Sequence, residues 1–242
     1  MTTAILIPAR LHSTRLPAKL LLRETGQSVL RHTYEACLAA DCVRYLAVAT
    51  ADAEIAAEVR RWQGNVLWTR PDHANGTSRI AEAATALPPV IDLVLNVQGD
   101  EPAVDPLALD ALDAAMRAPG RWDVGTLVAP LAAERADQRS TVKAAVSGQR
   151  ALYFSRAPLA GAMHHVGVYA YRRDRLAILR HWPFHSELMA AECLEQLGFL
   201  EIGWQMLACR IPAPFLSVDT RDDYEQFVRW HRNRTAARER CN

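Results

Sequence analysis

Short apolar runs alternate with segments of helical apolar spacing along the first half of the chain. The apolar runs predict strands at residues 4–8, 45–50, 66–69 and 93–97. The spacing between them predicts helices at 29–40, 53–61, 77–87 and 106–116. Because strands that alternate with helices are typical of parallel sheets, the pattern predicts an α/β fold with a doubly wound, mostly parallel sheet.

The second half is less regular, and its strands follow one another more closely. Strands are expected at 124–129, 142–146, 167–171 and 207–211, and helices at 173–181, 186–199 and 221–232. This succession predicts an antiparallel extension of the same sheet. No repeat or low-complexity linker separates the halves, so we expect a single domain over residues 1–242, with halves at about 1–120 and 121–230 and a basic tail at 231–242.

Composition excludes several classes of protein. The formal net charge of +1 provides no global basic field for nucleic acid. The five cysteines are scattered and lack metal-binding spacing, which disfavours a disulfide framework or structural zinc. No stretch reaches the roughly 18 apolar residues of a membrane span, so we expect a cytoplasmic protein without membrane insertion. No nucleophile elbow, GxGxxG or Walker A pattern appears, which disfavours covalent catalysis and a nicotinamide cofactor.

The loop after the first expected strand carries cations and hydroxyls between two prolines. Arg10, Ser13, Arg15 and Lys19 follow the strand's carboxyl end, where open α/β sheets bind ligands. Lysine occurs only at Lys19 and Lys143, and a lysine is a compact charge that can follow one phosphate oxygen. The loop therefore suits a polyanion such as a nucleoside triphosphate. A solvated basic loop is the alternative, and the role of Lys143 stays open.

Two aspartates far apart in the sequence are candidate magnesium ligands. Asp100 follows the strand at 93–97, and Asp219 precedes the last expected helix. Mg²⁺ prefers one or two carboxylates together with phosphate oxygens and water. Gln98 lies beside Asp100 and can donate and accept hydrogen bonds to a base, a ribose or a sugar. A polar turn around Asp100 and a helix N-cap at Asp219 are the alternatives.

Further polar residues lie in a turn and in the second half. Gly76 permits close backbone approach at a helix start, where free amides and Arg79 could meet an anion or a base edge. Residue types that suit a polyhydroxylated acid, with an arginine for its carboxylate, occur at Arg156, His165, Tyr169, Glu195 and Gln196. Helical spacing places Glu192, Glu195 and Gln196 on one face. An ordinary N-cap, solvated polar residues and a structural histidine are the alternatives.

Together these segments resemble the 3-deoxy-manno-octulosonate cytidylyltransferases, also called CMP-Kdo synthetases. The matching stretches follow the family's order from Ile5 to about Trp230: IPARLHSTRLPAK, ANGTSR, NVQGDEP, VKAAV, ALYFSR, HVGVYAYR, ECLEQL and VDTRDDYE. The resemblance implies Mg²⁺-dependent activation of 3-deoxy-manno-octulosonate (Kdo) by CTP in lipopolysaccharide biosynthesis. The products would be CMP-Kdo and pyrophosphate.

The resemblance also implies roles for individual residues. The first half would bind CTP through Arg10, Ser13, Arg15, Lys19, Gly76, Arg79 and Gln98, and the metal would lie on Asp100 and Asp219. The second half would bind the sugar acid, with contacts from Gln98, Arg156, His165, Tyr169, Glu195 and Gln196. The catalytic residues would be Lys19, Arg10 and Asp100. Family members are commonly homodimers, so part of the second half would form a dimer interface.

Three positions depart from the family's pattern and leave the sugar acid open. Only eight residues, 157–164, separate Arg156 from His165, where the family usually has a much longer loop. Gly198 replaces the arginine that usually ends the LEQLR motif, and Ser78 replaces an acidic residue. The alternatives are therefore a cytidylyltransferase for an amino-Kdo or sialic-type acid, or a nucleotide-binding regulatory protein without catalysis.

Overall fold

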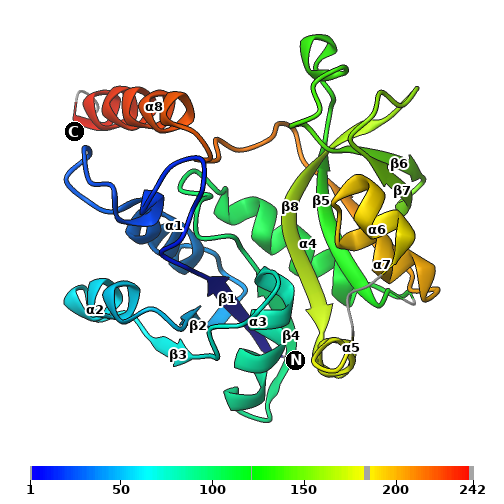
Figure 1. Ribbon diagram of the computed structural model, residues 1–242, viewed down its shortest axis with the longest axis horizontal. Coiled ribbons are helices and arrows are strands. Elements are labelled where there is room, and N and C mark those ends of the chain that lie inside the picture. Colours follow the sequence, from blue (N-terminus) through cyan, green and yellow to red (C-terminus); the bar gives the residue numbers. More distant parts are fainter. Residues whose placement is uncertain (1, 121, 183–185, 240–242) are drawn as a thin grey trace.

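The computed structural model describes residues 2–120, 122–182 and 186–239, and its strands form one mixed sheet (Figure 1). Within the described residues the strand order is β3-β2-β1-β4-β8-β5-β9-β7-β6. The bounds are β1 (Thr2–Pro8), β2 (Val43–Thr50), β3 (Val66–Trp68), β4 (Ile91–Asn96), β5 (Val124–Ala129), β6 (Lys143–Ser147), β7 (Arg150–Ser155), β8 (Met163–Arg172) and β9 (Met206–Arg210). Each expected strand is present, and β7 is an additional one.

Strand directions divide the sheet into a parallel part and a mixed part. The strands β3, β2, β1 and β4 run parallel to one another. The strand β8 lies between β4 and β5 and runs antiparallel to both, so it joins the two halves of the chain. Because β6 also pairs with β8, the last five strands of the order close into a ring of pairings. The expected α/β class is confirmed, and the sheet as a whole is mixed.

Helices cover both faces of the sheet (Figure 1). Successive side chains of a strand point to opposite faces. Ile5 and Ile7 of β1 therefore pack in a core with α1, α2, α4 and α8, whereas Ala4 and Leu6 pack in a second core with α3, α5 and α7. The bounds are α1 (Val29–Leu38), α2 (Ala53–Arg61), α3 (Gly76–Ala83), α4 (Pro106–Arg117), α5 (Arg173–Leu179), α6 (Glu187–Glu192), α7 (Gln196–Glu201) and α8 (Arg221–Glu239).

Two expectations about helices are wrong in detail. The helix expected at 186–199 is two short helices, α6 and α7, because Cys193 adopts a left-handed backbone with φ 52° and ends α6. Glu192 therefore does not share a helix face with Glu195 and Gln196. The last helix continues beyond 232 to Glu239, so it includes most of the expected basic tail, of which 240–242 lie outside the described residues.

The hairpin of α6 and α7 packs tightly at the position where the family's arginine is missing. A Cβ atom on the buried Gly198 would lie 2.5 Å from Sδ of Met189 on α6. The bare backbone of Gly198 therefore permits this close approach. Across the described residues, no helix is long and apolar enough to cross a membrane.

Candidate functional site

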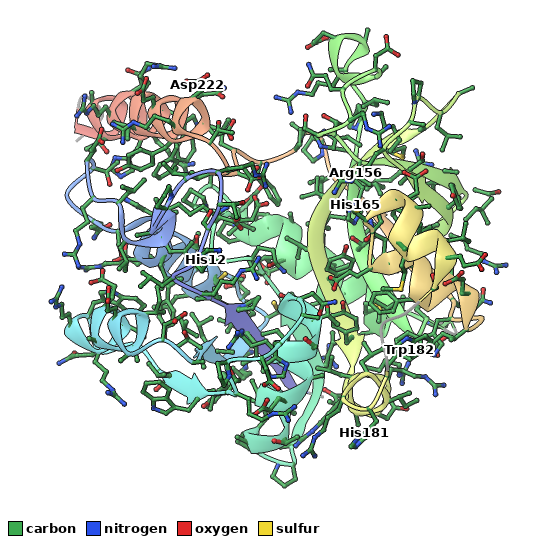
Figure 2. All side chains as sticks on the ribbon, in the orientation of Figure 1. His12, Arg156, His165, His181, Trp182 and Asp222 are labelled. Atoms are coloured by element: carbon green, nitrogen blue, oxygen red, sulfur yellow. The ribbon has the colours of Figure 1, made fainter. Side chains whose placement is uncertain are left out.

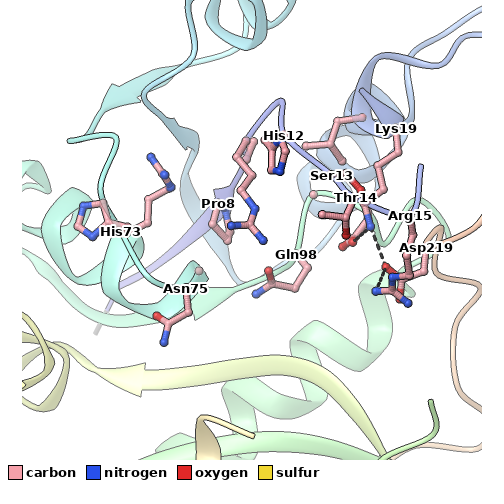
Figure 3. A pocket seen from close by; sticks show the side chains of 17 residues that line it. Pro8, His12, Ser13, Thr14, Arg15, Lys19, His73, Asn75, Gln98 and Asp219 are labelled. Atoms are coloured by element: carbon pink, nitrogen blue, oxygen red, sulfur yellow. Dashed lines mark hydrogen bonds and ion pairs between the residues drawn. The ribbon is translucent and has the colours of Figure 1, made fainter. Parts of the chain in front are cut away.

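Two connected cavities lie beyond the carboxyl ends of β1 and β4. The first has a volume of about 260 Å³, and its walls include every residue expected to contact CTP or the metal (Figure 3). The second has a volume of about 510 Å³ and is lined by His165, Tyr169, Glu195 and Gln196. The cavities share part of their walls, formed by Arg15, Asn75, Gly76, Gln98 and Asp219. The structure thus places two ligand spaces side by side.

The basic loop is held at the sheet edge by backbone hydrogen bonds. The amide of Ala9 donates to the carbonyl of Ala49 at 2.9 Å, and the amide of Leu11 donates to the carboxylate of Asp52 at 2.8 Å. Ala18 has a left-handed backbone, with φ 50°, directly before the short 3₁₀ helix that begins at Lys19. A non-glycine residue in this region stores about 1 kcal/mol or more of strain, and such strain is common at functional sites.

Lys19 joins the two candidate metal ligands. Its Nζ lies 2.5 Å from Oδ2 of Asp100 and 2.8 Å from Oδ1 of Asp219. Arg15 also contacts Oδ1 of Asp219, at 2.9 Å (Figure 3). Burial by itself would lower the pKa of Lys19, but the two carboxylates outweigh it and raise the pKa. Lys19 therefore stays charged between Asp100 and Asp219.

The backbone explains how residues so far apart in sequence meet. The amide of Val218 donates to the carbonyl of Asp100 at 2.9 Å, which fixes the segment before α8 against the turn after β4. A third carboxyl group, that of Glu101, lies nearby. Loss of solvent and then the charges of Asp100 and Asp219 raise its pKa well above the ordinary value. The turn therefore brings three carboxyl groups close to Lys19, of which Asp100 and Asp219 contact it directly.

Asp100 and Asp219 fit a magnesium ion. Their oxygens converge on one cation, since a single Nζ contacts both. Mg²⁺ typically takes one or two carboxylates and completes its shell with phosphate oxygens and water. Among the described residues no group of three or more His, Cys, Asp or Glu side chains could form an all-protein metal site. This donor set suits a metal that binds together with a phosphorylated ligand.

The turn at the start of α3 packs against Gln98. The side chain of Asn75 caps the helix by accepting from the amide of Ser78 at 2.8 Å. A Cβ atom on Gly76 would approach the Gln98 side chain to 3.1 Å, so glycine leaves room beside Gln98. Arg79 is buried, and its Nη1 donates to Oγ1 of Thr69 at 2.6 Å. One turn therefore forms both the N-cap of α3 and part of the wall of the first cavity.

The second cavity contains a carboxyl group with unusual chemistry. Glu195 accepts a hydrogen bond from Oγ1 of Thr77 at 2.8 Å, while its buried Oε2 has no partner among the described residues. Burial raises the pKa of Glu195 to about 7. Beside it, the hydroxyl of Tyr169 donates to Oε1 of Gln196 at 3.3 Å. A partly protonated carboxyl group can both donate and accept hydrogen bonds, as sugar hydroxyls require.

His165 and Arg156, both labelled in Figure 2, have different contacts. His165 lines the cavity, with Nε2 3.0 Å from Oγ1 of Thr126, and burial lowers its pKa to about 3. Arg156 lines neither cavity. Its guanidinium donates to the carbonyls of Glu192 and Arg139, each at 3.0 Å. Arg156 is therefore the predicted sugar-binding residue that the structure does not bring to the cavity wall.

Several wall residues were not predicted from the sequence. Glu101 lines the second cavity and directly follows Asp100, so its neighbour gave a signal. His164 lines the same cavity and directly precedes the predicted His165, whereas no pattern around Arg135 indicates a ligand site. The placement of Arg135 depends on the path of the segment before β6.

Comparisons with known proteins find similar chains among cytidylyltransferases. A family model described as Cytidylyltransferase matches residues 4–206. The 3-deoxy-manno-octulosonate cytidylyltransferase of Syntrophobacter fumaroxidans is 39% identical over 236 residues, which cover 92% of this chain and 94% of that protein. The enzyme of the same name from Escherichia coli is 38% identical over 225 residues, covering 89% of this chain and 90% of its own.

Solved structures show the same architecture. The structure of CMP:2-keto-3-deoxy-manno-octonic acid synthetase complexed with CTP superimposes with a TM-score of 0.91 at 35% identity. That match covers 97% of this chain and all of the other. The 4-diphosphocytidyl-2C-methyl-D-erythritol synthase of Anaerococcus prevotii matches with a TM-score of 0.65 at 13% identity, which shows a shared fold alone.

Proposed function

We propose that this chain, which belongs to the 3-deoxy-manno-octulosonate cytidylyltransferase family, transfers the cytidylyl group of CTP to Kdo and releases pyrophosphate. The observation that carries the proposal is the common wall of the two cavities. Arg15, Gln98 and Asp219 face both of them, so a triphosphate and a sugar acid could meet there. Holding two reactants in line is a large part of such catalysis.

The proposed reaction is an in-line displacement at phosphorus. The hydroxyl on the anomeric carbon loses its proton to water, and its oxygen forms a bond to the α-phosphorus. The bond from that phosphorus to the oxygen that bridges the α- and β-phosphates breaks, and pyrophosphate leaves. Arg10, Arg15 and Lys19 neutralise the triphosphate and the departing pyrophosphate. As the phosphates enter, they attract Lys19 away from Asp100 and Asp219 and leave both carboxylates available. A magnesium ion bound there would neutralise phosphate charge and lower the pKa of the attacking hydroxyl.

Release of pyrophosphate tests the proposal. We expect magnesium-dependent release with CTP and Kdo, and much slower release with UTP. Asp100→Asn should reduce kcat/KM by about 100-fold or more, because one of two metal ligands loses its charge. If Asp100→Asn stayed within a few-fold of the unaltered enzyme, the metal assignment would be wrong.

A related acid is the second candidate substrate. The short segment 157–164 leads from β7 into β8, and its last residue, His164, lines the sugar cavity. Gly198 lies two residues after Gln196, which lines the same cavity. A panel of Kdo, amino-Kdo and sialic-type acids with CTP distinguishes these substrates. CTP binding without turnover of any acid would instead support a regulatory nucleotide-binding protein.

The assembly and cellular setting are part of the same proposal. A homodimer formed through the second half is the arrangement common in the family, and sedimentation velocity would measure it. We further propose a cytoplasmic enzyme that supplies activated sugar acid to lipopolysaccharide synthesis. Neither point depends on the residues of the two cavities.

A further inference from the structure

An anionic sugar needs a positive charge in the second cavity, and few candidates are present. The cations that line it are Arg15 and Arg135. Arg15 already contacts Asp219 at 2.9 Å. The two histidines of the wall cannot supply charge near neutral pH. Burial lowers the pKa of His165 to about 3, and burial followed by the charges of Arg135 and Lys143 lowers the pKa of His164.

Arg135 is an uncommitted cation at this wall. It ends the short 3₁₀ helix Ala133–Arg135, and within the described residues its guanidinium has neither a hydrogen bond nor an ion pair. Nearby, Nδ1 of His164 is buried and lacks a partner in the described part of the chain. A free guanidinium beside a free ring nitrogen matches a carboxylate with adjacent hydroxyls.

The sheet register places the His164 end of β8 at the edge of the sheet where the proposed reaction occurs. The strand β4 ends at Asn96, which pairs with Tyr169 of β8. Because β8 runs antiparallel to β4, the chain that continues from Asn96 to Asp100 turns toward the His164 end of β8. The carboxylate of a 2-keto sugar acid is bonded to the carbon that bears the attacking hydroxyl. The carboxylate must therefore lie at the same edge of the sheet.

Two buried or partly buried cations hold the segment that carries Arg135. Nζ of Lys143, which is fully buried, donates to the carbonyl of Gln138 at 2.6 Å and to the carbonyl of Arg156 at 3.1 Å. The guanidinium of Arg156 donates to the carbonyl of Arg139. Both side chains therefore fasten residues 138–139 to the end of β7, which limits where Arg135 can lie.

We propose that Arg135 binds the carboxylate of the sugar acid, and that Lys143 and Arg156 are positioning residues that hold its segment over the cavity. The inference rests on the proposed function and assigns the acid-binding cation within it.

Arg135→Gln is the direct test, with Arg139→Gln as the matched control. Arg139 lies on the same segment and is exposed, but its side chain lines neither cavity. We expect Arg135→Gln to raise the KM for Kdo about 10- to 100-fold, the range of one charged contact, while the KM for CTP stays unchanged. Arg139→Gln should change neither KM.

A neutral analogue of the substrate shows whether Arg135 contacts the carboxylate or affects the reaction in another way. The C1 carboxamide of Kdo should be a poorer substrate than Kdo for the unaltered enzyme and nearly equal to it for Arg135→Gln. An equal loss with both substrates would overturn the assignment to the carboxylate, as would an unchanged KM for Kdo. If the unaltered enzyme released no pyrophosphate from CTP and Kdo, the proposed function itself would fail, which is a separate result.

The positioning role makes a different prediction. Arg156→Met should raise the KM for Kdo without affecting the KM for CTP, which also shows that the CTP half is folded. If Arg156 acts only through Arg135, the double variant Arg135→Gln/Arg156→Met is no worse than Arg135→Gln alone. Multiplied effects in the double variant would mean that Arg156 contacts the acid itself and would refute the positioning role.

Discussion

Glu195→Gln should make the protein more stable at alkaline pH while impairing its activity. Glu195 is partly exposed as a residue, but its Oε2 is buried and has no partner among the described atoms. Burial raises its pKa from 4.5 to about 7. The folded state therefore binds this proton more tightly than the unfolded state does. Stability is lost as the pH rises from about 4.5 to 7, because folding then requires a carboxylate to be desolvated.

The size of the effect follows from the pKa difference. Each pH unit between the two pKa values corresponds to about 1.4 kcal/mol, so the ionised Glu195 costs up to about 3 kcal/mol above pH 7. Partial exposure of the residue reduces this figure toward about 2 kcal/mol. The amide introduced by Glu195→Gln would keep the size of the side chain and an oxygen for the hydroxyl of Thr77, without the buried charge.

Urea unfolding between pH 4 and 9 measures the difference. We expect the two proteins to be equally stable near pH 4, and the variant to be more stable by about 2–3 kcal/mol at pH 8. Glu192→Gln is the matched control, since hydrogen bonds from the Arg156 amide and Ser155 lower the pKa of Glu192. That control should lose stability toward neutral pH. Parallel pH profiles for Glu195→Gln and the unaltered protein would refute the reasoning.

Two further predictions concern the metal site and the α6–α7 hairpin. Without CTP, the Lys19→Met variant should bind Mn²⁺ more tightly than the unaltered protein, because no lysine competes for Asp100 and Asp219, and its kcat should be lower by about 100-fold or more. Electron paramagnetic resonance would measure free Mn²⁺, and an unchanged affinity would contradict the competition. In a Met189→Ala background, Gly198→Ala should add about 1 kcal/mol to the free energy of unfolding. With Met189 present the gain should be clearly smaller, because the new Cβ then meets Sδ of Met189. Equal shifts of the melting temperature in both backgrounds would contradict this packing.

Local patterns in the sequence were sufficient for most strands and for the cations and carboxylates of the site. Continuous apolar runs bounded by polar turns predicted β1, β2 and β4, because strands covered on both faces need such runs. Pattern reasoning failed where the backbone conformation of a single residue ended a helix. Helical spacing continued through Cys193, but its left-handed conformation separates α6 from α7. Periodicity does not report such a break.

Arg156 shows why a residue type does not fix a role. An arginine beside a candidate sugar pocket suits a carboxylate, and the sequence offers nothing to distinguish it from Arg135. In the fold, the guanidinium of Arg156 donates hydrogen bonds to two backbone carbonyls, whereas Arg135 lines the cavity. The difference arises from the path of the segment before β6, which no local pattern predicts.

The sequence by itself determined the chemical inventory: a basic loop after the first strand, two separated aspartates, and a set of polar residues suited to a hydroxylated acid. Only the tertiary structure decided which of these meet. Insertion of β8 between β4 and β5 brings Glu195 and His165 beside Gln98, and the hydrogen bond from Val218 to Asp100 brings Asp219 to Lys19. Such contacts depend on strand order and on long-range backbone pairing, whereas sequence patterns report only the local conformation.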